Sequence, residues 1–371
     1  MNERKKVLVI TAHPDDESLW FTSVIKRNDT DLVCVTCGDS DEVRVRREAE
    51  LREAAALLGI KELTILYFND IFEQRLDLEE LTERLRPFTE RTYSEVYTHG
   101  IYGDTNEHYH HQDISYIVHK LFDNVFSTAW NLYPDKVNTL TEEEYRLKKY
   151  IMGTIYHIEY KLLKTTYELS SIEKFIRLNK AAVDIYYWGI GNFGDNHELL
   201  GNKYTDIWGY GKSQYEQERH DTINEFIYHT NARRVLEIGA HEGLLTEKIA
   251  NHAEVICTEK ADVYKRKLRE KGFQVVEEFN SSDYDLIVIA SVLEYMPDAE
   301  DFLERLNSDF LVVEIINTAG MERELDVLNT KYTCLKSKVI LPRWEDMYHG
   351  EEKENLQVYR LGCQVKLFKR K

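Results

Sequence analysis

Short apolar runs alternate with amphipathic segments over the first 125 residues of the chain. The apolar runs, which predict strands, occupy residues 6–11, 31–37, 63–68 and 94–100. The amphipathic segments, which predict helices, occupy residues 16–28, 40–60 and 77–92. This alternation is typical of a doubly wound α/β fold built on a parallel sheet.

A second alternation follows in the C-terminal half. A strand-turn-helix pattern covers residues 233–250, and further apolar runs predict strands at 253–260, 284–291 and 309–316. The last sixty residues are β-rich, and residues 356–370 resemble a closing antiparallel pair. We therefore expect two doubly wound, Rossmann-like α/β domains in series, residues 1–188 and residues 189–371.

The segment between the two alternations has a different character. Residues 141 to about 185 read as mostly helical and are rich in tyrosine. Six glycines, interleaved with aromatic residues, follow between Gly189 and Gly211. This segment is the best candidate for a domain junction or for a loop that closes over a ligand.

Composition narrows the class of protein. A chain of 371 residues with 43% hydrophobic and 31% charged residues is typical of a soluble globular protein with two domains. There is no apolar run of about 18 residues and no secretory pattern at the N-terminus. Five widely scattered cysteines fit a reducing cytoplasm. Cys34 and Cys37 sit on one predicted strand and face opposite ways, so they are not expected to share a metal.

The formal net charge of −18 constrains the partners. Such a field repels nucleic-acid phosphates, and no basic stripe relieves it. We expect a neutral or cationic small-molecule substrate, with no nucleic-acid or membrane partner; the sequence does not indicate an oligomeric state.

Candidate chemistry begins with the stretch HPDDE, residues 13–17, directly after the first strand. Ligands of open α/β sheets bind beyond the carboxyl ends of the strands. Acids in the first turn of a helix are equally well explained by its dipole, and Pro14 suits the first helical position. This stretch alone does not decide between the two readings.

A histidine cluster shifts the balance toward a metal. It follows the strand at 94–100 and consists of His99, His108, His110 and His111. Both loops leave the carboxyl ends of strands, so they can converge on one edge of the sheet. Hydrolytic zinc sites use three nitrogen or oxygen ligands and keep one position for water. His13, Asp16 and His111 would supply that set; the alternative is a hydrated loop that merely contains histidines.

The motifs AHPDDE and RREAELREAAALLG, with the later HxxH, resemble the PIG-L/LmbE-like zinc deacetylases over about residues 5–120. That family removes acetyl groups from N-acetylglucosamine-type amides. The resemblance implies His13, Asp16 and His111 as ligands of zinc or another divalent metal, Asp15 as general base and His108 as the transition-state-stabilising histidine. It also implies two substrate contacts, Arg47 and Asp70.

One departure concerns the second motif. The family usually writes it HPDH, whereas this chain has HYHH, with Tyr109 and His110 in the places of the proline and the acid. The metal ligand supplied by this motif is therefore either His110 or His111. The chemistry needs such groups, because an amide carbonyl is a poor electrophile. A metal polarises it and acidifies water, a carboxylate moves the proton, and a histidine steadies the oxyanion.

The C-terminal half carries a second candidate site at the turn that contains Gly239 and Gly243. A single G-x-x-x-G turn is weak evidence. However, Glu259 ends the next strand 20 residues after Gly239, where a ribose is normally bound. Glu237 stands just before the turn, and no phosphate-binding lysine follows. An acidic turn of this kind favours a cationic cofactor such as S-adenosylmethionine.

Residues 204 to about 300 resemble class I S-adenosylmethionine-dependent methyltransferases, most of all the NodS-like branch of N-methyltransferases. The resemblance implies the cofactor contacts Glu237, Gly239, Gly243, Glu259, Trp208, Tyr215 and Ser291. Glu294 and Tyr295 are the expected acceptor-side residues. The branch usually has GxGxG, and His241 replaces the middle glycine, where its side chain would narrow the approach of the cofactor.

Together these features predict a bifunctional enzyme. Its first domain would hydrolyse an N-acetyl group from an amino sugar or sugar conjugate, and its second would N-methylate the freed amine. One alternative keeps the deacetylase but directs methylation to an oxygen or a carboxylate. In another, one domain has lost its chemistry and only binds a ligand.

Overall fold

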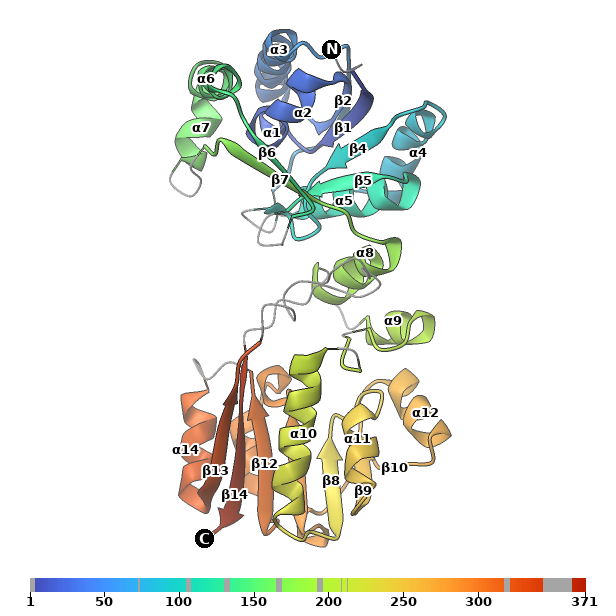
Figure 1. Cartoon of the computed structure of the whole chain (residues 1–371), viewed down its shortest axis with the longest axis vertical. Helices are drawn as coiled ribbons and strands as arrows, with labels where there is room; N and C mark the ends of the chain where they lie inside the picture. Colours follow the sequence, from blue (N-terminus) through green and yellow to red (C-terminus); the bar gives the residue numbers. More distant parts are fainter. Residues whose placement is uncertain are drawn as a thin grey trace. The chain divides into compact units, whose positions relative to one another are not determined.

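The computed structural model describes residues 4–72, 74–104, 108–129, 134–164, 169–191, 196–207, 209–211, 213–316, 321–342 and 362–371. The chain divides into two compact units, residues 1–194 and residues 195–371 (Figure 1). In the described ranges, no helix combines the length and the apolar character that crossing a membrane requires. All five cysteines are free, and Cys34 and Cys37 are both buried.

The first unit is built on a seven-stranded sheet with the order β3-β2-β1-β4-β5-β7-β6. Strands β3, β2, β1, β4 and β5 are parallel, whereas β7 and β6 join the edge antiparallel. The strands are β1 (Lys6–Thr11), β2 (Asp29–Thr36), β3 (Glu62–Phe68), β4 (Glu95–Thr98), β5 (Val125–Thr128), β6 (Lys136–Thr139) and β7 (Ile172–Ile176).

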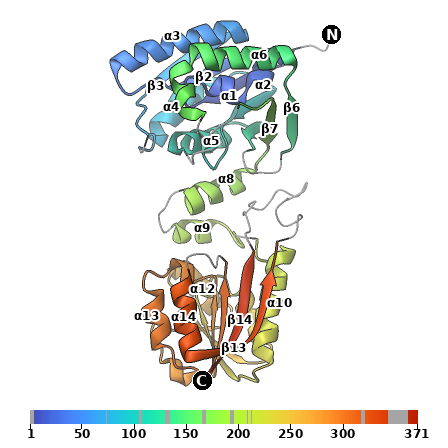
Figure 2. The ribbon, with the colours of Figure 1, turned by 90° about the vertical axis from the view of Figure 1, so that its left-hand side faces the viewer.

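Helices cover both faces of this sheet (Figures 1 and 2). One face carries α1 (Asp16–Trp20), α2 (Thr22–Arg27), α3 (Asp41–Leu58) and α6 (Glu142–Tyr150); the other carries α4 (Leu78–Thr89) and α5 (Tyr109–Leu121). The unit also contains α7 (His157–Leu163), α8 (Lys180–Tyr186) and the π-helical turns Ile151–Ile155 and Tyr187–Gly191. Every residue of β1 after Lys6 is buried, as expected for a strand covered on both faces.

Two local expectations for this unit are wrong, and a third is incomplete. The single helix expected over residues 16–28 is two short helices, because the chain leaves the helical conformation at Phe21. The segment from 141 to about 185 is mostly helical, as expected, but it also contains strand β7, which pairs with both β5 and β6. The sheet is mixed rather than wholly parallel.

The second unit repeats this topology, with the strand order β10-β9-β8-β11-β12-β14-β13. Its first five strands are parallel and β14 and β13 are antiparallel. The strands are β8 (Arg234–Ile238), β9 (Glu254–Thr258), β10 (Gln274–Val275), β11 (Leu286–Ala290), β12 (Phe310–Ile315), β13 (Tyr332–Ile340) and β14 (Cys363–Arg370). Of the stretch predicted to form a closing pair, residues 356–361 lie outside the described residues, and β14 pairs with β13.

The helices of this unit also form two layers around a buried sheet. They are α9 (His197–Lys203), α10 (Gln214–Tyr228), α11 (Leu244–Ile249), α12 (Asp262–Glu270), α13 (Ala299–Arg305) and α14 (Glu322–Lys331). Val235 of β8 packs in one core with α10 and α11, and Leu236 packs in the other with α13 and α14. Successive strand residues therefore serve opposite faces, as the pleat requires.

The strand order places one switch point in each sheet, between β1 and β4 and between β8 and β11. Connections leave such neighbouring strands toward opposite sides, which opens a crevice beyond their carboxyl ends. The loops after these strands are therefore the places to look for ligand sites.

Candidate functional site

In the first unit, the loop after β1 and the start of α5 meet at the switch point. His13 and Asp16 come from the loop and from the first turn of α1, and His111 lies in the first turn of α5. Helix α5 begins at this point because His108 caps it, its ring accepting a hydrogen bond from the main-chain N–H of His110. The two sequence segments predicted to converge do so.

Three donor atoms approach one another closely here. His13 Nδ1 lies 3.2 Å from His111 Nε2 and 3.4 Å from Asp16 Oδ2, and the last two atoms are 3.6 Å apart. A tetrahedral ion with ligands at about 2.0–2.2 Å separates those ligands by roughly 3.3–3.6 Å. The triangle therefore fits a single divalent cation such as Zn²⁺ without rearrangement.

Asp104 orients two histidines from behind this triangle. His99 and His111 each donate an Nδ1–H to Asp104 Oδ2 at 2.7 Å. The other oxygen of Asp104 accepts the Gly100 N–H at 3.2 Å and the Thr128 hydroxyl. Metal-ligating histidines usually donate their second ring N–H in this manner, so the bond exposes Nε2 of His111 to the candidate metal position.

The electrostatics suit a cation. Burial alone would raise the pKa of Asp16, but His111 and His99 hold it well below the usual range. Burial opposes a charge on His13 as well, yet its contacts with Asp16 and Asp70 raise its pKa to about 10. The acids of this site therefore favour positive charge beside them, which a bound divalent ion would supply.

Asp15 stands beside the triangle in a strained conformation. Its φ is 110°, in the left-handed region that non-glycine residues rarely adopt, and such outliers cluster at functional sites. Its main-chain N–H donates to Glu17 at 3.0 Å. Burial raises the pKa of Asp15 to about 8, although the Arg47 guanidinium opposes this shift.

Arg47 is buried on α3 and braces this loop. Its Nη2 contacts Asp15 Oδ2 at 3.3 Å and donates to the carbonyl of Pro14, and its Nη1 lies 3.1 Å from Glu159. The expected substrate-contact residue is therefore already engaged by the loop that carries the expected base. Asp70, which follows β3, is 24% exposed and lies 3.3 Å from His13 Nε2.

In the second unit, the turn after β8 has the backbone that its glycines permit. Gly239 and Gly243 have φ of 70° and 82°. A Cβ on Gly239 would lie 2.7 Å from Val292 Cγ2, so the turn tolerates no side chain there. His241 also adopts a positive φ, 49°, and its ring packs 3.8 Å from the Tyr264 ring, centroid to centroid.

The two acids expected to bind cofactor flank this turn. Glu259 accepts the His241 N–H at 2.8 Å with one oxygen and the N–H groups of Lys260 and Ala261 with the other. Glu237 is buried and accepts the Thr246 hydroxyl at 2.6 Å. Burial raises the pKa of Glu237 to about 7, and the nearby Glu259 adds to the shift.

A buried polar network lies beyond β11 and β12. Arg219 of α10 donates to Ser291 at 2.9 Å and pairs with Glu314 at 3.1 Å and Glu216 at 2.6 Å. Of the other expected residues, Tyr215 is buried nearby in the core on α10, Glu294 accepts the Ile316 N–H at 2.7 Å, and Tyr295 is 77% exposed. Trp208 lies outside the described residues.

Sequence reasoning assigned no role to Asp104, Arg219 or Glu314. Glu314 leaves a signal, because it is the one acid inside the apolar run LVVEII of β12 and is fully buried. Asp104 and Arg219 leave no such signal in the sequence, because each is one polar residue among other polar residues.

Comparisons with known proteins agree with this two-part arrangement. Residues 8–122 match the family model of PIG-L, GlcNAc-PI de-N-acetylase, and residues 206–314 match that of DREV methyltransferase. The N-acetylglucosaminyl-phosphatidylinositol de-N-acetylase of Saccharomyces cerevisiae is 26% identical over 184 residues, which are 45% of this chain. The chain spans 60% of the length of that yeast protein.

Solved structures are similar to each half. One is the N-methyltransferase NodS from Bradyrhizobium japonicum with S-adenosyl-L-homocysteine, at 19% identity and a TM-score of 0.37, covering 47% of this chain and 99% of that one. Another is the N,N'-diacetylchitobiose deacetylase from Pyrococcus horikoshii, at 18% identity and a TM-score of 0.36, covering 52% and 89%. The family matches identify the chain as one that joins a PIG-L de-N-acetylase domain to a methyltransferase domain of the DREV family.

Proposed function

We propose that this chain is a bifunctional enzyme that first removes an N-acetyl group from an amino sugar or glycoconjugate and then methylates the freed amine. The observation that carries the first half is the triangle of His13 Nδ1, Asp16 Oδ2 and His111 Nε2, with separations of 3.2–3.6 Å. The family matches at residues 8–122 and 206–314 support the pairing of the two reactions.

In the hydrolytic half, His13, Asp16 and His111 would hold a divalent metal, whose Lewis acidity polarises a carbonyl and lowers the pKa of water. Asp15 would take the proton of the attacking water and return one to the leaving amine. The raised pKa of Asp15 suits a group that must both accept and release a proton near neutrality.

His108 is the proposed stabiliser of the developing oxyanion. Its Nδ1 accepts the His110 N–H at 3.3 Å, so the neutral ring carries its proton on Nε2. Burial lowers the pKa of His108 to about 2, which keeps the ring neutral. A neutral donor can then strengthen its hydrogen bond as charge develops on the substrate oxygen. Arg47 and Asp70 stay proposed substrate contacts.

In the second half, we propose S-adenosylmethionine as the methyl donor, held at the turn after β8. Glu237, Gly239, Gly243 and Glu259 would line it, with Trp208, Tyr215 and Ser291 as further contacts. Among the described residues, Glu314 Oε1 and Glu294 Oε2 are buried side-chain oxygens without a hydrogen-bond partner. The other oxygen of each carboxylate is engaged, Glu314 by Arg219 and Glu294 by the Ile316 N–H, so one oxygen of each is available to a cationic ligand.

Methyl transfer to an amine mainly requires alignment of donor and acceptor and an uncharged nitrogen. Glu294 and Tyr295 are the proposed acceptor-side residues, and burial raises the pKa of Glu294, which favours its acting as a proton acceptor. The first reaction would supply such an amine, which gives the fusion its chemical reason.

Mass spectrometry of an N-acetylglucosaminide incubated with the full chain, Zn²⁺ and S-adenosylmethionine tests the order. We expect loss of the acetyl mass before gain of the methyl mass, and no methyl gain without the cofactor. An Asp15→Asn variant should block both events on this substrate but still methylate the corresponding free amine. Methylation of the compound that is still acetylated would contradict the proposal.

A further inference from the structure

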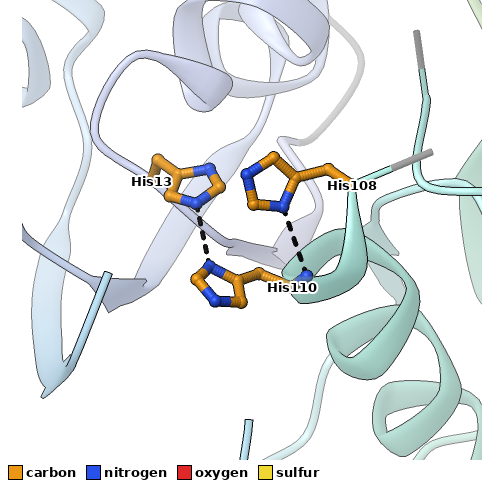
Figure 3. A group of neighbouring side chains, drawn as sticks. All are labelled: His13, His108 and His110. Carbon is orange, nitrogen blue, oxygen red and sulfur yellow. Dashed lines mark hydrogen bonds between the residues drawn. The ribbon is translucent and has the colours of Figure 1, made fainter. Parts of the chain in front are cut away.

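The ring of His13 presents its two nitrogens to two different groups of donor atoms. Nδ1 belongs to the triangle with Asp16 and His111 described above. Nε2, on the opposite side of the ring, lies 3.2 Å from His110 Nδ1 and 3.3 Å from Asp70 Oδ1. His110 comes from the first turn of α5, and its ring faces that of His13 (Figure 3). Asp70 comes from the loop after β3, so two separate elements supply this second group.

The second group also closes into a triangle. His110 Nδ1 and Asp70 Oδ1 are 3.7 Å apart, so its three sides measure 3.2, 3.3 and 3.7 Å. The sides of the first triangle are 3.2, 3.4 and 3.6 Å. All six sides lie within about 0.1 Å of the separation of roughly 3.3–3.6 Å between ligands of a tetrahedral ion. Two nitrogens and one carboxylate oxygen are donors that Zn²⁺, Co²⁺ and Cu²⁺ accept.

The second triangle holds three donor atoms around a single proton. Nε2 of His13 carries one proton at most and cannot donate it fully to both neighbours. The 3.7 Å between His110 and Asp70 is too long for a hydrogen bond. His110 is buried, and its Nδ1 faces Nε2 of His13 at 3.2 Å, where the lone pair of this nitrogen is available to a metal.

We propose that this site holds two divalent transition-metal ions, one on each side of His13, with the His13 ring shared between them. The second ion is bound by His13 Nε2, His110 Nδ1 and Asp70 Oδ1. The inference rests on the proposed function in that both use His13 and Asp70; here Asp70 binds the second ion in place of the substrate contact proposed above.

The charges of the site balance for two ions. Binding of both removes both ring protons of His13, which leaves an imidazolate bridge of charge −1. With Asp16, Asp70 and Asp104, the negative charge then equals the positive charge of two divalent cations. Asp70 is 24% exposed, whereas Asp16 is 4% exposed, so the second ion should exchange with solvent more readily and bind more weakly.

His108 stands beside this position without being needed as a ligand. Its ring centroid lies 4.6 Å from that of His13 and 4.9 Å from that of His110. Because its Nδ1 accepts the His110 N–H, its Nε2 carries the proton and is a donor rather than a metal ligand. The oxyanion role proposed for His108 is therefore compatible with a metal on His110.

Metal stoichiometry of the full chain tests the inference. Protein stripped with a chelator is titrated with Zn²⁺, and the bound metal is counted after removal of free ion. We expect two ions per chain for the wild type, bound in two steps, and one ion for Asp70→Asn and for His110→Ala. The control variants Asp39→Asn and His157→Ala alter exposed residues outside the cluster and should still bind two.

Electron paramagnetic resonance gives a readout on the unaltered protein. If both positions hold Cu²⁺, the shared ring couples the two spins, and the signal per copper falls below that of a chain loaded with one equivalent. One ion per wild-type chain, or two ions in both Asp70→Asn and His110→Ala, would overturn the inference. If the wild-type chain binds one ion and still releases acetate from an N-acetylglucosaminide, only this inference is wrong. If it binds two ions and releases no acetate, only the proposed function is wrong.

Discussion

The substitution Asp104→Asn probes how the metal triangle is held in place. Asp104 accepts four hydrogen bonds: two from the rings of His99 and His111, and two from Gly100 and Thr128. An asparagine has the same shape but only one acceptor atom. Its oxygen can face either the two histidines or the other two donors, and its NH₂ group must face the pair that remains.

Either orientation leaves a conflict. With its oxygen toward the histidines, the asparagine turns a donor against the Gly100 N–H. In the reverse orientation it forces His111 to move its proton to Nε2, the nitrogen that must bind the metal. A buried donor left without an acceptor costs about 1–3 kcal/mol. Loss of an outer-shell partner of a metal-ligating histidine typically lowers metal affinity 10–100-fold, or by about 1.4–2.8 kcal/mol.

The assay is competition for Zn²⁺ against a chromogenic chelator at fixed pH. Asp113→Asn serves as the matched control, because Asp113 is also a buried carboxylate of this unit but its partners are Arg75, Leu76 and Tyr187. We expect Asp104→Asn to weaken Zn²⁺ binding 10–100-fold and Asp113→Asn to leave it near the wild-type value. An Asp104→Asn protein that is folded and keeps wild-type affinity would refute the reasoning.

Three predictions concern stability and pH. Lys148 and Glu173 form a buried pair at 3.4 Å, so Lys148→Met should cost about 3–5 kcal/mol in chemical denaturation. Adding Glu173→Gln should recover part of this loss; a double variant no more stable than Lys148→Met would contradict the pairing. Glu237 has a pKa raised from 4.5 to about 7 by burial, so the folded state binds more protons than the unfolded state between these values and stability falls as pH rises. Glu237→Gln should therefore raise the melting temperature at pH 8 much more than at pH 5, and equal shifts would disprove this assignment. Gly239→Ala should destabilise the second unit by about 2 kcal/mol, because the φ of Gly239 is 70° and the new methyl group would meet Val292. An unchanged melting curve would contradict the backbone conformation described for this turn.

The parts of the fold that sequence patterns predicted are those dictated by burial. The run VLVIT after Lys6 could only be a strand covered on both faces, and it forms the inner strand β1. Strand β7 was missed because long-range antiparallel pairing with β5 and β6, rather than local periodicity, decides its conformation. The break at Phe21 was missed for a related reason, since tertiary packing overrides a continuous helical pattern.

The sequence also predicted which segments of the candidate site come together, but not how their side chains are oriented. Spacing and strand order place His13, Asp16 and His111 at one sheet edge, because the carboxyl ends of β1 and β4 are adjacent. Neither indicates which ring nitrogen faces which partner. The bracing of His111 by Asp104, and the contacts of His13 Nε2 with Asp70 and His110, depend on side-chain directions that only coordinates contain.

The central claim is that the carboxylates at the start of the chain serve a metal that hydrolyses an amide. Acetate release from an N-acetylglucosaminide by the full chain, measured before chelation, after chelation and after return of Zn²⁺, tests it most directly. We predict that chelation abolishes acetate release and that Zn²⁺ restores it in the wild type but not in Asp16→Asn. Acetate release that survives complete removal of metal would contradict the account.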